Sequence, residues 1–183
     1  MMPSDILSSE HRMIERAMDC LEQIAMQTES SGRLDVGLAG AAVDFFRNFA
    51  DRYHHGKEES HFFPAMESRG FPREAGPVGV MLHEHELGRR RVAAMDEAIS
   101  VVSGGIQAAA RQFAENARAF IALLRNHIEK EDHCLFSMAN QAFTADDQQN
   151  LLDAFAEVEL ADGGKSEQTY TKLIEAMNSR LPP

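Results

Sequence analysis

The chain contains an internal repeat, and this repeat constrains its fold more than any other feature of the sequence. Residues 10–16 (EHRMIER) match residues 84–90 (EHELGRR), and residues 54–64 (HHGKEESHFFP) match residues 127–137 (HIEKEDHCLFS). The first match is offset by 74 residues (85 − 11) and the second by 73 (127 − 54). Two matches in the same order, at nearly the same offset, predict two similar halves that are each built from a pair of helices.

The spacing of apolar residues predicts an all-α fold, and no segment shows a convincing strand pattern. We expect four long helices, at about residues 5–28, 34–68, 78–102 and 106–142. Residues 69–77 read as a loop because they contain two prolines and two glycines. Four long helices with short connections favour an antiparallel up-down-up-down four-helix bundle.

The residues after the fourth helix predict short C-terminal helices. Thr144, followed three residues later by Asp147, resembles a helix N-terminal capping signature. Asp162-Gly163-Gly164 predicts a break between two helices. Apolar residues recur there at Leu151, Leu152, Phe155, Val158, Leu173, Ile174 and Met177. We therefore expect a bundle at residues 1–142 and an extension at residues 143–183 that packs along it or makes a homodimer contact.

The charge balance limits the classes of partner. The 183 residues include 29 acidic and 18 basic ones, which gives a formal net charge of −11. Nucleic acids and anionic membranes attract basic surfaces, so neither is expected as a partner. No apolar run reaches the ~18 residues of a membrane span, and the N-terminus does not resemble a secretory signal. With two cysteines and no disulfide framework, we expect a cytoplasmic protein.

The repeated motifs carry histidine and glutamate at a spacing that suits metal binding. Residues four apart lie on one face of a helix, so each His-x-x-x-Glu points an imidazole and a carboxylate the same way. The second and fourth helices each carry this motif, and the first and third each carry a single histidine. Four imidazoles and two carboxylates that converge on the bundle axis suit two transition-metal ions bridged by the carboxylates. This donor set favours iron, with manganese or zinc as alternatives.

Neighbouring residues leave alternatives open. His55 and Glu59 form a second His-x-x-x-Glu, rotated by about 100° from the pair His54 and Glu58. The pair His54 and Glu58 is favoured because Ile128 occupies the position of His55 in the fourth helix. If His54 and Glu58 are the inward pair, Glu59→Ala is expected to leave metal binding nearly unchanged.

Other polar residues near the motifs have two interpretations. His61 and Cys134 each follow a repeat histidine by seven residues, so they either fill the core opposite each other or act as a proton relay and a redox-active thiol. Arg89 and Glu15, each one turn after a single histidine, are expected to pair and to orient ligands. His83 and His133 point away from the inward stripe and are expected at the surface.

The motifs at residues 54–64, 81–89 and 126–136 resemble those of the hemerythrin-type HHE cation-binding domain, and the resemblance covers about residues 5–142. It implies a four-helix bundle with a non-haem, oxo- or hydroxo-bridged centre of two iron ions. The ligands that it implies are His11, His54, Glu58, His85, His127 and Glu131.

The third helix departs from the oxygen-carrying members of this family, which place two histidines four residues apart there. Here Arg89 stands four residues after His85, which leaves a nearly symmetric set of four His and two Glu. This set is similar to that of bacterial iron-centre repair proteins and of the iron-sensing HHE domain of a eukaryotic ubiquitin-ligase subunit. The resemblance implies a protein that binds or senses oxygen, nitric oxide or iron. The alternative is a di-iron enzyme with peroxidase-like, nitric oxide reducing or iron-centre repair activity, in which case peroxide is a further candidate ligand.

Overall fold

The computed structural model describes residues 1–162 and 165–181, and within these ranges every regular element is a helix. The all-α prediction is therefore confirmed. Gly163 and Gly164, where the sequence predicts a break, lie outside the described residues. Among the helices described, none has both the length and the apolar character that crossing a membrane would require.

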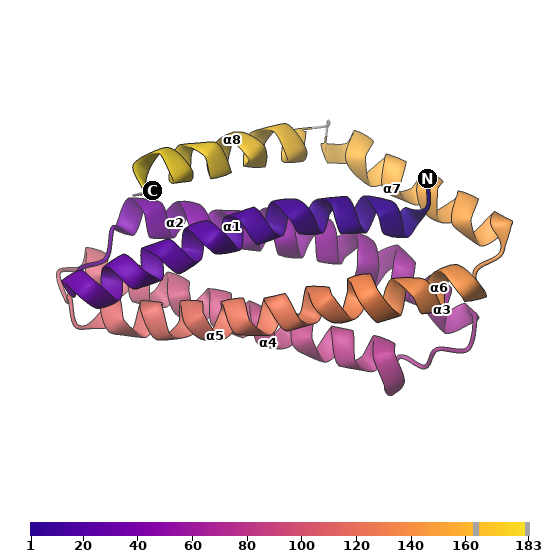
Figure 1. Ribbon diagram of the computed structural model, residues 1–183, viewed down its shortest axis with the longest axis horizontal. Coiled ribbons are helices and arrows are strands. Elements are labelled where there is room, and N and C mark those ends of the chain that lie inside the picture. Colours follow the sequence, from indigo (N-terminus) through magenta and orange to yellow (C-terminus); the bar gives the residue numbers. More distant parts are fainter. Residues whose placement is uncertain (163–164, 182–183) are drawn as a thin grey trace.

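Four helical rods form the bundle (Figure 1). The first rod is α1 (Pro3–Ser31) and the third is α4 (Gly76–Ser103). The second rod runs through α2 (Val36–Phe45), the π-helical segments η1 (Phe46–His55) and η2 (Glu58–Phe62), and α3 (Phe63–Ser68). The fourth rod runs through α5 (Ala109–Lys130), the π-helical segment η3 (Glu131–Leu135) and α6 (Phe136–Ala142).

The ends of the rods differ from the predicted bounds by a few residues. Pro77, expected in a loop, lies in the first turn of α4, where its missing N–H would have no helical partner in any case. The fourth rod begins at Ala109 rather than at residue 106, because the N–H groups of Ala109 and Ala110 bond to carbonyls three residues earlier, at 3.2 and 2.9 Å, and residues 106–108 therefore form a turn. Gly32, with φ 66°, ends α1 and donates its N–H to the carbonyl of Thr28 at 2.9 Å.

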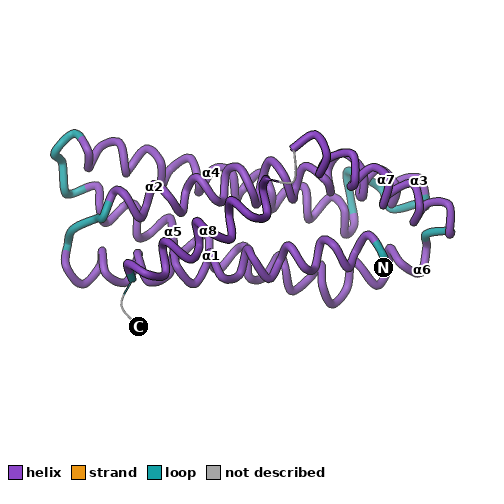
Figure 2. Tube along the Cα trace, turned by 90° about the horizontal axis from the view of Figure 1, so that it is seen from above, coloured by secondary structure: helices purple, strands orange, loops and turns teal. Residues whose placement is uncertain are grey.

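The rods contact one another in a closed ring, in which α1 packs on α2, α2 on α4, α4 on α5 and α5 on α1. Short connections join consecutive rods, so the chain direction alternates around the ring (Figures 1 and 2). The predicted antiparallel four-helix bundle is confirmed.

The apolar core is divided into two clusters, with a layer of buried polar residues between them. Along the first rod, Leu7 belongs to one cluster and Ile14 to the other, and buried His11 lies between them. Along the third rod, Met81 and Val92 flank His85 in the same way. Each rod therefore contributes apolar residues above and below one polar layer, which fixes the height at which those polar groups meet.

Two further helices, α7 (Ala145–Asp162) and α8 (Lys165–Arg180), lie along the bundle (Figure 1). The Thr144 N–H donates to Asp147 Oδ2 at 2.8 Å, and the Asp147 N–H donates to Thr144 Oγ1 at 3.2 Å, so the expected capping signature is confirmed. Helix α7 packs on α1 and η2, and α8 packs on α1 and α2. The division of the chain at residue 142 stays a prediction.

The mutation Phe155→Ala tests whether the extension is part of the same core. Phe155 is fully buried in the cluster that contains Phe62 and Leu7. We expect a loss of about 3–5 kcal/mol in the free energy of unfolding, measured by urea denaturation. Leu160→Ala, on the same helix at a side chain that is 79% exposed, should cost less than about 0.5 kcal/mol. Equal effects of the two variants would contradict this packing.

Candidate metal centre

Three π-helical segments carry most of the polar layer. His54 and His55 are the last two residues of η1, and Glu58 and Glu131 are the first residues of η2 and η3. In a π-helix each N–H bonds to the carbonyl five residues earlier, which widens the turn, and such segments are frequent at functional sites. A wider turn reduces the angle between consecutive residues. His54 and His55 are accordingly both buried, with exposed fractions of 1% and 7%.

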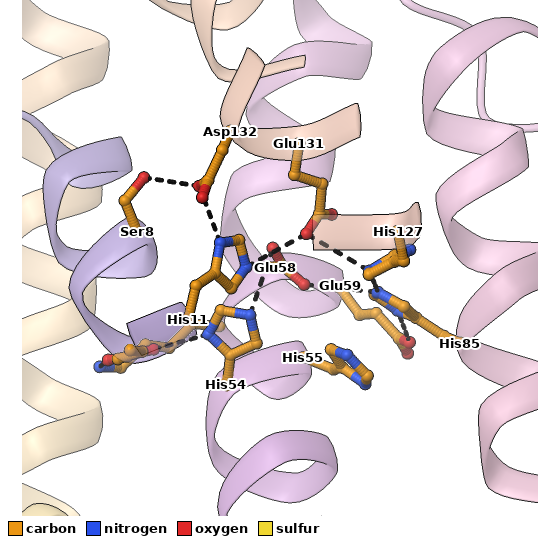
Figure 3. Close-up of polar contacts among 12 residues, drawn as sticks. Ser8, His11, His54, His55, Glu58, Glu59, His85, His127, Glu131 and Asp132 are labelled. Atoms are coloured by element: carbon orange, nitrogen blue, oxygen red, sulfur yellow. Dashed lines mark hydrogen bonds and ion pairs between the residues drawn. The ribbon is translucent and has the colours of Figure 1, made fainter. Parts of the chain in front are cut away.

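The buried donor atoms form two overlapping groups (Figure 3). The His11 group contains His11, His54, Glu58 and Glu131. The His55 group contains His55, Glu58, His85 and His127. Within each group the four donor atoms all lie within 4.8 Å of one another. Because Glu58 belongs to both groups, the layer is one continuous cluster of five imidazoles and two carboxylates.

The two carboxylates lie between the imidazoles of the two groups. Glu131 Oε2 is 3.3 Å from His11 Nε2 and 3.3 Å from His127 Nε2. Glu58 Oε1 is 3.8 Å from His54 Nε2, and its Oε2 is 3.4 Å from His85 Nε2. Each carboxylate thus reaches both groups, which is the position that a bridging ligand needs.

A second set of carboxylates lies outside the imidazoles, one at each Nδ1. The pairs are His11 with Asp132 (2.8 Å), His54 with Glu10 (2.8 Å), His55 with Asp51 (3.3 Å), His85 with Glu59 (2.7 Å) and His127 with Glu84 (3.0 Å). A carboxylate at this position accepts a hydrogen bond from Nδ1–H and directs Nε2 toward the centre, where its lone pair can bind a metal in place of a proton. The same contacts hold each ring in one orientation.

Cationic side chains in turn hold these outer carboxylates. Lys57, which is fully buried, donates to Glu10 at 2.5 Å, and its ammonium lies 4.0 Å from the centre of the Tyr53 ring. Arg89 donates to both Asp51 (2.8 Å) and Glu59 (2.6 Å).

The remaining two outer carboxylates have cationic partners as well. Lys130 pairs with Glu84, and Arg12 pairs with Asp132. The predicted pair of Arg89 and Glu15 is wrong, because Glu15 pairs with Arg12 at 3.0 Å.

Electrostatics within the cluster shift the imidazoles in opposite directions. Burial lowers the pKa of His11, but the hydrogen bond with Asp132 and the adjacent negative charge of Glu131 outweigh burial and raise it to about 10. The pKa of His85 rises to about 9, because the adjacent negative charge of Glu58 and the hydrogen bond with Glu59 likewise outweigh burial. Burial lowers the pKa of His54 to about 3. The carboxylates therefore attract positive charge strongly, and His54 stays a neutral lone-pair donor.

Several polar atoms of the cluster are buried without a hydrogen-bond partner. They are both carboxylate oxygens of Glu58, both of Glu131, and Nε2 of His11 and of His55. Leaving such atoms unpaired in an apolar interior costs several kcal/mol (roughly 1–3 each, and more for charged groups) unless a cation binds them. The unpaired atoms are nitrogen and oxygen donors that face one another, so the residues fit a pair of metal ions.

The family model described as the hemerythrin HHE cation-binding domain matches residues 2–139 of the chain. This chain belongs to that family. No curated protein and no solved structure matches it. The buried His and Glu groups of this HHE domain are consistent with a di-metal site.

The structure of this HHE domain brings together all six residues that the sequence singled out, and it adds a seventh. His55 stacks on His85 with the ring centres 3.7 Å apart and joins the cluster, which therefore holds five imidazoles instead of the expected four. The sequence argument assumed regular α-helical spacing, which would turn His55 away from the face that carries His54. The π-helical turn of η1 brings both residues to the inner face instead. Glu59 does not belong to the cluster but holds His85 in place.

His61 and Cys134 do not face each other, which overturns the expectation that they fill the core as a pair. His61 is half-buried, with its ring centre 6.5 Å from that of Phe155, and Cys134 is exposed, with its Sγ 3.8 Å from Met138 Sδ. Both follow a histidine across a π-helical segment, where a spacing of seven residues no longer returns to the same face. His83 and His133 are exposed, as predicted.

The contact between Glu59 and His85 revises the expectation that Glu59 has little effect. We expect Glu59→Gln to weaken metal binding about 10–100-fold without changing the number of ions bound, because His85 loses the carboxylate that orients it. Competition with a chromophoric chelator measures this affinity. Glu86→Gln, on the exposed side of α4, is the matched control and should have no effect. An unchanged affinity in Glu59→Gln would mean that His85 needs no such support.

Proposed function

We propose that this HHE domain holds two iron ions and that the reduced centre binds a diatomic molecule, oxygen or nitric oxide. One observation carries the proposal. All five imidazoles have a carboxylate at Nδ1, and all five Nε2 atoms belong to one buried cluster with two unpaired carboxylates. His85 Nε2 and His127 Nε2 lie 3.2 Å apart, but both oxygens of Glu58 and of Glu131 have no hydrogen-bond partner, whereas a purely structural polar layer would satisfy its buried carboxylates.

The two groups of donor atoms would each hold one ion. The His11 group would hold one ion and the His55 group the other, with Glu58 and Glu131 between them. Mixed imidazole and carboxylate donors are typical of iron sites that keep open positions, and they also accept manganese or zinc. Two adjacent iron ions with open positions supply binding sites and up to two electrons to a small ligand.

Two phenylalanine rings shield one side of this space from water. Phe136 stacks on His11 with ring centres 5.6 Å apart, and Phe63 stacks on His85 at 5.7 Å. These rings belong to the apolar cluster on one side of the polar layer. Exclusion of water on this side strengthens the electrostatic interactions within the centre.

The first test is the metal content and optical spectrum of protein purified in air, before and after addition of azide or peroxide. We expect about two iron ions per chain, as the two donor groups imply, with near-ultraviolet charge-transfer bands that azide perturbs. Two manganese or zinc ions would support the site and overturn the choice of iron. Absence of bound metal after anaerobic iron loading would overturn the proposal.

The mutation His55→Ala tests the seventh donor. We expect the iron content to fall from about two to about one per chain, because the His55 group loses one of its three imidazoles. His61→Ala, seven residues after His54 and outside the cluster, is the control and should retain both ions. Two ions and an unchanged spectrum in His55→Ala would reduce the ligand set to the six residues predicted from the sequence.

Turnover separates a binding protein from an enzyme. For a sensor or store, we expect the reduced protein to bind one equivalent of oxygen or nitric oxide per centre and then stop. Continued consumption of peroxide or nitric oxide in the presence of an electron donor would favour the enzyme alternative.

A further inference from the structure

A cavity opens on one side of the metal centre. It has a volume of about 280 Å³ and lies between η1, α4 and α5. Its inner wall is formed by His55, His85 and His127, the three imidazoles of the His55 group (Figure 3). Its remaining walls are largely apolar, with Phe46, Ala50, Val92, Phe120 and Leu124 among the residues that line it.

This cavity is distinct from the space between the metal ligands. Glu58 and Glu131, which lie at the centre of the cluster, do not line it. The cavity therefore begins on the outer side of the stacked rings of His55 and His85 and extends toward the surface.

The internal repeat relates this cavity to a position that is filled in the first half of the chain. Gly88 lines the cavity, and the repeat aligns it with Ile14, which is buried in the first half of the chain. A Cβ at Gly88 would meet a single neighbour, Phe120 Cε2, at an ordinary contact distance of 3.5 Å. The absence of a side chain at residue 88 thus leaves open the space that an isoleucine occupies in the equivalent position.

The charged side chains along the cavity are already paired. Arg47 pairs with Asp96 at 2.9 Å, and Arg89 pairs with Asp51 at 2.8 Å. Glu84 is held by His127 and by Lys130. No unpaired charge among these residues is available to bind an ionic ligand, so the cavity favours a neutral one.

We propose that the cavity binds a neutral organic molecule with an apolar body of at least benzene size, placed against His55, His85 and His127. A buried apolar cavity of about 150 Å³ is sufficient to bind benzene, and a diatomic molecule needs far less. The volume of about 280 Å³ therefore exceeds what passage of oxygen or nitric oxide requires. The inference extends the proposed function by naming a second class of ligand beside the metal ions, and the binding itself does not depend on their identity.

Isothermal titration with phenol tests the proposal, with benzoate as the charged counterpart. The titration uses protein of measured metal content. We expect phenol to bind at one site with a Kd on the order of 1 mM or tighter. Benzoate should bind the metal-free protein about tenfold more weakly, because no unpaired cationic side chain lines the cavity. Equal binding of benzoate would overturn the preference for a neutral ligand.

Two substitutions that fill the cavity locate the site. Gly88→Ile restores the residue that the repeat has at this position, and Ala50→Leu fills the same space from η1. Each should weaken phenol binding at least about tenfold. Gly40→Ile, at a helical glycine with no atom within 4 Å of an added Cβ, is the matched control and should bind phenol like the parent protein.

The outcomes of this experiment are separate from those of the iron measurement. Absence of phenol binding, or equal binding by Gly88→Ile, Ala50→Leu and the control, would overturn the organic-ligand site even if two iron ions are present. Phenol binding that both substitutions abolish would support it even if the metal proves to be zinc.

Discussion

The structure depends on two carboxylates, Glu58 and Glu131, that are fully buried at the centre of the bundle without a hydrogen-bond donor. Burying an unpaired negative charge costs free energy of folding, so the surroundings must supply cations or hydrogen-bond donors. Five imidazoles surround the carboxylates, and each is held at its outer nitrogen by a further carboxylate that contacts lysine or arginine. From the centre outward, the layer thus consists of carboxylates, then imidazoles, then further carboxylates, and finally lysine and arginine side chains. Such an arrangement prepares the inner nitrogen atoms for a cation and explains why the bundle tolerates so much polarity in its core.

The repeat extends beyond the inner residues to the groups that orient them. Lys57 holds Glu10, which holds His54, and at the repeat offset Lys130 holds Glu84, which holds His127. Glu59 and Asp132 likewise hold His85 and His11. The two halves of the chain therefore build two equivalent sets of supports around one pair of bridging carboxylates.

Two of the positions at which the halves differ lie on the same side of the centre. His55 adds an imidazole where the fourth rod has Ile128, and Gly88 leaves space where the first rod has Ile14. One side of the centre consequently has three imidazoles and an adjoining cavity, while buried isoleucines occupy the two equivalent positions of the repeat. An approximately symmetric scaffold thus presents two chemically different faces, which is the basis for assigning a second ligand to one of them.

The amino-acid sequence by itself determined the number of rods, their direction and the six inner residues, because periodicity and repeat spacing are local properties that survive without coordinates. The same repeat also contained the outer supports, since Glu10 and Glu84 precede the single histidines and Lys57 and Lys130 share the offset. Only the tertiary structure decided that His55 faces inward and that His61 and Cys134 do not face each other. The reason is that π-helical turns change the angular step along a rod. They occur where packing against other rods requires them, and a regular α-helical projection cannot anticipate them. The cavity was likewise decided by tertiary structure, because the space beside Gly88 exists only where three rods meet.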